Sequence, residues 1–374
     1  MHVDDDPVSD FLGALNLSEE QLIRLDSMSE EDLAREIGEM LASASAALLQ
    51  SLRQEMPAGL AANREYRVGF EARLRARWKP ALDLYELIMV TTQEAGHVFN
   101  ATHRPQAAAN NDAKFEALSR LHARACLTAS EILSLLTSGH ADGAHSRWRT
   151  LHEIAVVALL LSEHDNTLAE RYLLHDAIQA AKGAELYAKY EDRLSEYPIT
   201  QAELEEHRAR RAYLIATYGK GFESDYGWAA GVLNIREPKF DQIEREVGLD
   251  HIRPYYRMAS ISVHPNARGL NFSLAAYQSR MLLAGPSDGG LADPGHHALL
   301  SLLQCTVCLI NLRPGIEQAT LLPALQQLTD EAGEAFLAAH QEQEREMQKR
   351  AAEEINGTER SPSEQEQEIR RRHG

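Results

Sequence analysis

The fold is decided by the stretch DGAHSRWRTLHEIAVVALLLSEH, residues 142–164. From Ile154 onward this stretch is apolar on most sides of a 3.6-residue period, which is typical of a helix that other helices surround. Its first half is polar and aromatic, and polar groups at the edge of a core need partners. We therefore expect a central core helix over residues 142–163.

The segments on either side repeat the helical pattern. Residues 114–138 carry apolar side chains at three- to four-residue spacing and end at Gly139, a common stop signal for a helix. No segment alternates with period two for long enough to predict a sheet. The sequence predicts an all-α fold with a multi-helix bundle core, whose further helices are expected at 165–192, 200–218, 226–234, 240–247, 251–264, 267–283 and 295–312.

The region before this core is charged and helical. Serines followed by acidic residues predict helix starts in SEEQLIRLDSM (18–28) and SEEDLAREIGEMLASASAALLQSL (29–52). Pro80 is expected to kink or divide a helix that runs from about 62 to 100. HRPQAAANND (103–112) is expected to be a linker because it combines proline with asparagines.

The C-terminal part begins as a helix near residue 322 and becomes almost devoid of apolar residues after Met347. Such a sequence cannot bury a core. The predicted organisation is an acidic then basic helical N-terminal region (1–104), a helical core (114–320), and a charged helix with a disordered tail (321–374).

Composition limits the class of protein. The chain has 374 residues and a formal charge of −18, which argues against a protein that coats duplex DNA. Residues 1–56 hold thirteen Asp or Glu against three Arg, so a local basic surface elsewhere stays possible. No stretch approaches the roughly 18 unbroken apolar residues of a membrane helix, and no apolar leader follows a basic start. We expect a cytoplasmic protein without membrane partners.

The sequence lacks the motifs of several enzyme classes. It contains no phosphate-binding Gly-rich loop, nucleophile elbow or zinc-protease histidine pair, so we expect no cofactor and no metal. Three cysteines are too few for a disulfide framework. CTVC, residues 305–308, lies within an apolar run and is interpreted as core packing rather than half of a zinc site.

Two groups of residues are candidates for chemistry. Arg149 and Glu153 are four apart on the central helix and should meet on one face, either as a structural salt bridge or as part of a site. In YYRMASISVHPNARG, residues 255–269, Arg257 and His264 are seven apart and would share a face if residues 251–264 were helical. A guanidinium can stabilise developing negative charge while an imidazole moves a proton.

Four blocks of this sequence resemble, in order, the bacterial domain-of-unknown-function family 5677. The resemblance covers roughly residues 114–312 and rests on these blocks: ARACLTASEILSLLTSGHADGAHSRWRTLHEIAVVALLL (123–161), RYLLHDA (171–177), YGWA (226–229) and YYRMASISVHPNARG (255–269). The helical core and the last block are also similar to the HEPN superfamily (higher eukaryotes and prokaryotes nucleotide-binding), many of whose members are metal-independent ribonucleases in toxin–antitoxin and anti-phage systems.

The superfamily resemblance implies a role for each candidate residue. Arg257 and His264 would take the arginine and histidine of the superfamily motif, and Glu153 with Arg149 would take its supporting position on an earlier helix. The usual polar residue directly after the arginine is here Met258. The resemblance also implies a homodimer, RNA as substrate, and an antitoxin or other regulatory protein as partner.

Two functions follow from these observations. The first is a metal-independent endoribonuclease of HEPN type, a toxin or anti-phage defence effector, with Arg257, His264, Glu153 and Arg149 at its site. The second is a non-enzymatic helical regulatory or assembly module in which the Arg/Glu/His network is structural. A nuclease should place His264 in a solvent-reachable cleft beside basic residues, whereas a structural network should bury it with no opening.

Overall fold

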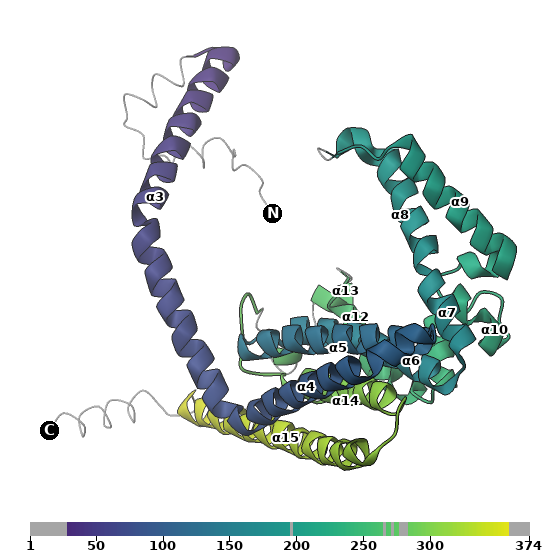
Figure 1. The fold of residues 1–374 in the computed structure, drawn as a ribbon. Coiled ribbons are helices and arrows are strands. Elements are labelled where there is room, and N and C mark those ends of the chain that lie inside the picture. Colours follow the sequence, from purple (N-terminus) through teal and green to yellow (C-terminus); the bar gives the residue numbers. More distant parts are fainter. Residues whose placement is uncertain (1–27, 195–196, 265–266, 271–272, 277–282, 359–374) are drawn as a thin grey trace. The chain divides into compact units, whose positions relative to one another are not determined.

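The structure is a computed structural model that describes residues 28–194, 197–264, 267–270, 273–276 and 283–358. Within these ranges it consists of α-helices, short 3₁₀ helices and connecting turns, without a strand (Figure 1). The predicted all-α fold is confirmed. The chain divides into two compact units, residues 1–70 and 71–374, and each is considered by itself. No described helix is both long enough and apolar enough to cross a membrane.

The described part of the first unit, residues 28–70, consists mainly of helix α3 (Glu30–Arg77), whose last residues from 71 onward belong to the second unit. The predicted start at Ser29 is confirmed, because the Ser29 hydroxyl accepts a hydrogen bond from the Asp32 backbone N–H at 3.3 Å. The helix continues past Pro57, and every residue from 41 to 68 is exposed. The helix expected at 18–28 lies outside the described residues, apart from its last position.

The second unit contains α4 (Lys79–Ala109), which begins directly after Trp78 with Pro80 in its first turn. Proline is tolerated there because its missing N–H would have no partner within the helix. The predicted division at Pro80 is therefore confirmed. The linker predicted for 103–112 is wrong: the helix continues to Ala109, since the run of alanines favours helix and Ala107 is buried in the core.

The core of the second unit is formed by α5 (Ala113–Thr137), α6 (Ala141–Glu163) and α14 (Ala292–Ile310), which pack side by side (Figure 1). As expected, α6 is the central helix, and its residues from Ile154 to Leu161 are almost all buried. Cys305 and Cys308 of α14 are buried free thiols, as the core interpretation of CTVC predicts. Helix α15 (Ile316–Thr358) covers α4 and α14.

Close approach between helices depends on glycines. A Cβ on Gly295 of α14 would collide with the ring of Phe336 on α15, and a Cβ on Gly96 of α4 would collide with the imidazole of His122 on α5. Phe336 and His122 are both buried. Glycine at these positions lets a large ring occupy the space that a side chain would fill.

The segment predicted as one helix over 165–192 is instead two helices, α7 (Asn166–Leu174) and α8 (Asp176–Tyr190), separated at His175. His175 Nε2 donates a hydrogen bond to the Ser224 carbonyl at 2.9 Å, which holds the junction. Helix α9 (Gln201–Tyr218) packs against α8. The 3₁₀ helix η1 (Glu191–Arg193) lies between α8 and α9. After α9 come η2 (Lys220–Glu223), η3 (Gly227–Ala229) and the short helix α10 (Ala230–Leu233).

Three short elements follow α10: α11 (Phe240–Glu246), η4 (Asp250–Ile252) and α12 (Arg253–Ile261). The helix predicted over 251–264 is therefore too long at its C-terminal end. The helix predicted over 267–283 is also wrong in its described part, which contains only α13 (Ala267–Leu270) and η5 (Leu274–Ala276). The C-terminal helix begins at Ile316 rather than near 322, and the tail from 359 lies outside the described residues.

Candidate functional site

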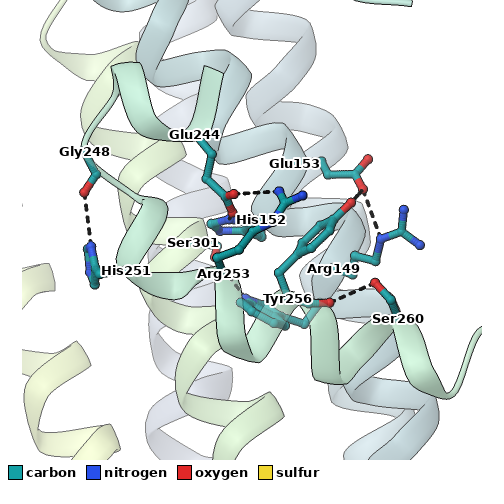
Figure 2. A network of polar contacts seen from close by, with 11 residues as sticks. Arg149, His152, Glu153, Glu244, Gly248, His251, Arg253, Tyr256, Ser260 and Ser301 are labelled. Carbon is teal, nitrogen blue, oxygen red and sulfur yellow. Dashed lines mark hydrogen bonds and ion pairs between the residues drawn. The ribbon is translucent and has the colours of Figure 1, made fainter. Parts of the chain in front are cut away.

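The candidate site lies where α12 packs against α6 (Figure 2). Arg149 and Glu153 of α6 meet as their spacing predicts, with Arg149 Nε 3.2 Å from Glu153 Oε1. Arg149 Nε makes no hydrogen bond, so this contact is an ion pair. The two side chains are 29% and 32% exposed, and solvent can therefore reach them.

Tyr256 of α12 completes this group. Its hydroxyl donates a hydrogen bond of 2.5 Å to Glu153 Oε1, and the Arg149 guanidinium lies over its ring at 4.9 Å from the centroid. Burial and the hydrogen bond to Glu153 raise the pKa of Tyr256 to about 12, so its proton stays in place at neutral pH. Tyr256 thus joins α12 to the polar end of the central helix.

A second polar group lies on the other side of Tyr256 (Figure 2), and its carboxylate and imidazole are buried. Glu244 of α11 is 0% exposed and uses both carboxylate oxygens. Oε1 accepts from His152 Nε2 at 2.9 Å, and Oε2 accepts from Arg253 Nη1 at 2.7 Å. Since His152 is only 2% exposed, this group fastens α6, α11 and α12 together away from solvent.

Arg257 and His264, the two residues of the predicted motif, belong to neither polar group. Arg257 is exposed on α12, one position after Tyr256. His264 is also exposed, but α12 ends at Ile261, so His264 lies three residues beyond the helix. The argument that two helical turns bring Arg257 and His264 onto one face is therefore wrong. Neither side chain forms a hydrogen bond or ion pair with another described residue.

A stack of aromatic rings fixes the first half of α6 to α14. Trp148 packs against both His145 and His297, with centroid distances of 5.2 and 5.0 Å, and its Nε1 donates to Ser301 Oγ at 3.1 Å. Burial lowers the pKa of His145 and of His297 to about 4. Both imidazoles are therefore neutral at pH 7, and we interpret this stack as packing rather than proton-transfer machinery.

A metal site would need several ligating side chains close together. Within the part of the chain that the structure describes, no three His, Cys, Asp or Glu side chains are grouped as metal ligands. Burial raises the pKa of the Cys305 and Cys308 thiols, which disfavours the thiolate that binds metals.

Sequence reasoning found the Arg149–Glu153 pair and missed Tyr256, His152, Glu244 and Arg253. The hydroxyl of Tyr256 and the carboxylate of Glu153 come from residues 103 positions apart, and His152 and Glu244 are 92 apart.

One region of the chain is similar to a known protein family. Residues 115–278 match the model of a family of unknown function, DUF5677. This range contains both polar groups and the predicted motif, and it confirms the predicted similarity to that family over a shorter stretch than expected. No curated protein and no solved structure is significantly similar to the chain. The resemblance to the HEPN superfamily stays a prediction.

Proposed function

We propose that this protein is a metal-independent endoribonuclease of HEPN type that acts as a cytoplasmic toxin or anti-phage defence effector. One observation supports this most directly: Arg257 on α12 and His264 just beyond its end are exposed and have no described ion-pair partner, while the buried groups hold α12 in place. An exposed guanidinium and imidazole can reach a phosphodiester. A structural network that included these two residues would bury them.

The proposed reaction uses the 2′-hydroxyl of RNA as the nucleophile, so no metal-activated water is needed. His264 accepts the proton of the 2′-hydroxyl while its oxygen attacks the adjacent phosphorus. The bond from the 2′-oxygen to phosphorus forms, the bond to the 5′-oxygen breaks, and the leaving oxygen takes a proton from an acid such as imidazolium. The products are a 2′,3′-cyclic phosphate and a 5′-hydroxyl, and Arg257 stabilises the charge on the phosphate.

Glu153 and Arg149 act as positioning residues in this proposal. Glu153 is already bonded to the Tyr256 hydroxyl, and Arg149 lies over the Tyr256 ring, so both hold the turn of α12 that precedes Arg257. RNA is the proposed substrate. A homodimer and an antitoxin or other regulatory protein are the proposed assembly and partner.

A second function is favoured by the deeply buried group. Glu244 and His152 are inaccessible to solvent, and with Arg253 they connect three helices. A non-enzymatic helical regulatory or assembly module would need these contacts and no exposed chemistry. Under this alternative, Arg257 and His264 are ordinary surface residues.

An RNA cleavage assay distinguishes the two functions. Purified full-length protein is incubated with 5′-labelled RNA in the presence of EDTA, and products are tested for a 2′,3′-cyclic phosphate. We expect cleavage by the wild type and a loss of about 100-fold or more for His264→Ala and for Arg257→Ala. His97→Ala and Arg245→Ala, which change exposed residues on other helices, are the matched controls and should cleave normally.

The same variants are expressed in cells, and their thermal melts are compared to show that each is folded. Toxicity that disappears in His264→Ala and persists in His97→Ala supports the nuclease. The proposal fails if wild type and His264→Ala are equally harmless and leave RNA intact under every trigger tried. A His264→Ala variant that stays folded and, like wild type, leaves RNA intact would support the structural module, in which His264 is an ordinary surface residue.

A further inference from the structure

Helix α3 carries an apolar stripe, defined as the six exposed side chains of Leu41, Leu48, Leu49, Leu52, Met56 and Leu60. Each is between 40% and 61% exposed. At 100° per residue, all six fall within about one third of the helix circumference. Gln50 and Gln54 lie on the opposite side. The helix is therefore amphipathic over these twenty positions, although none of its residues from 41 to 68 is covered.

Such a stripe requires a partner. A helix without tertiary packing is marginally stable in water, and most helical stability in proteins comes from burial of an apolar face. A contiguous row of exposed leucines is typical of an interaction surface. No charged residue occurs between 41 and 52, so nothing in the stripe itself opposes close packing against another apolar helix.

The charges beyond the two ends of the stripe indicate which partner fits. Residues 30–40 contain five acidic residues and one arginine, a net charge of −4. After the stripe, Arg64 and Arg67 lie within residues 61–70, where Glu65 is the only acidic residue. Two parallel copies of α3 would place their acidic starts side by side. Two antiparallel copies place each acidic start beside the arginines of the other copy.

We infer that α3 binds the α3 helix of a second copy of this chain in antiparallel orientation through the apolar stripe. The stripe runs from 41 to 60, so the twofold axis falls between residues 50 and 51. Leu49 then lies level with Leu52 of the second copy, and Ser45 lies level with Met56 of the second copy. Glu31 and Arg67 of opposite copies lie within about one helical turn on the same flank.

The first test measures self-association of the full-length protein by sedimentation velocity and equilibrium. We expect wild type to form a dimer at micromolar concentration and Leu48→Glu/Leu52→Glu to raise the dissociation constant by at least about 100-fold. Gln50→Glu/Gln54→Glu adds the same two charges on the opposite side of the helix and is the matched control, which should change the constant by less than about 3-fold. A monomeric wild type, or equal dissociation of both variants, overturns the inference.

The second test determines the orientation and does not depend on destabilising α3. One chain carries Ser45→Cys, another carries Met56→Cys, and each has a different tag. Mixed under oxidising conditions, they should give mainly the disulfide between different chains, because positions 45 and 56 are level only in the antiparallel pair. A predominance of disulfides between identical chains indicates a parallel pair and contradicts the proposal. The absence of any disulfide indicates that another segment or protein covers the stripe.

The native thiols at Cys126, Cys305 and Cys308 are buried, so they should contribute little background. This inference does not depend on the proposed ribonuclease. Both tests report self-association alone, and RNA cleavage can fail or succeed independently of them.

Discussion

Glu244 provides the strongest test of how the candidate site is held together. Replacing it by alanine removes the acceptor of two hydrogen bonds, from His152 Nε2 at 2.9 Å and from Arg253 Nη1 at 2.7 Å. His152 is 2% exposed, so its N–H would be left buried without a partner, at a cost of about 1–3 kcal/mol. Arg253 is 34% exposed and can turn toward water, which limits its share to about 1–2 kcal/mol.

The sum predicts that Glu244→Ala lowers the free energy of unfolding by about 2–5 kcal/mol, which includes the range found when one partner of a buried ion pair is removed. Urea denaturation followed by circular dichroism measures this value. Glu246→Ala, an exposed glutamate on the same helix, is the matched control and should change stability by less than about 0.5 kcal/mol. A loss below about 1 kcal/mol for Glu244→Ala would refute the claim that this carboxylate fastens α6, α11 and α12.

Three further predictions concern the packing of the core and the site. Tyr256→Phe removes the hydroxyl that bonds Glu153 at 2.5 Å and should cost about 1–3 kcal/mol in a thermal melt, whereas an unchanged melting temperature would contradict this contact. Gly295→Ala should cost about 1–3 kcal/mol because the new methyl group meets the Phe336 ring, while Gly231→Ala, where the methyl group meets nothing, should be nearly neutral. Burial lowers the pKa of His122, His145 and His297 to about 4. As pH drops from about 6.5 toward 4, the unfolded chain takes up protons that the folded chain excludes, so each of these histidines should lower stability by up to about 3 kcal/mol. Melting temperatures between pH 7.5 and 5 test this, and a flat profile refutes it.

Local patterns were sufficient to predict most of the helices. The apolar run after Ile154 and the proline at 80 act through neighbouring residues, so the central helix and the α3/α4 break were predictable. The two kinds of error also have local causes. At 103–112, Pro105 and two asparagines favoured the prediction of a linker, but the neighbouring alanines keep the helix intact to Ala109. At 251–264, the helix ends at Ile261, three residues before His264. The β-branched residues Ile261 and Val263 and the proline after His264 disfavour helix there.

The candidate site was predictable only where its contacts are local. Arg149 and Glu153 are one helical turn apart, and their ion pair follows from that spacing alone. Tyr256 and Glu244 reach α6 from about a hundred residues away, so their contacts depend on how α11 and α12 return to the central helix. A single sequence contains no information that selects Glu244 over other glutamates as the partner of His152.

The structural and catalytic interpretations of this region are compatible, because they concern different sides of α12. Arg253 and Tyr256 are one turn apart, and their contacts with Glu244 and Glu153 fix the first half of the helix against the core. Arg257 follows Tyr256 by one residue, which turns its side chain by about 100° and leaves it exposed. Loss of stability in variants of Glu244 or Tyr256 therefore says nothing about catalysis. Only the exposed pair, Arg257 and His264, separates a nuclease from a structural module.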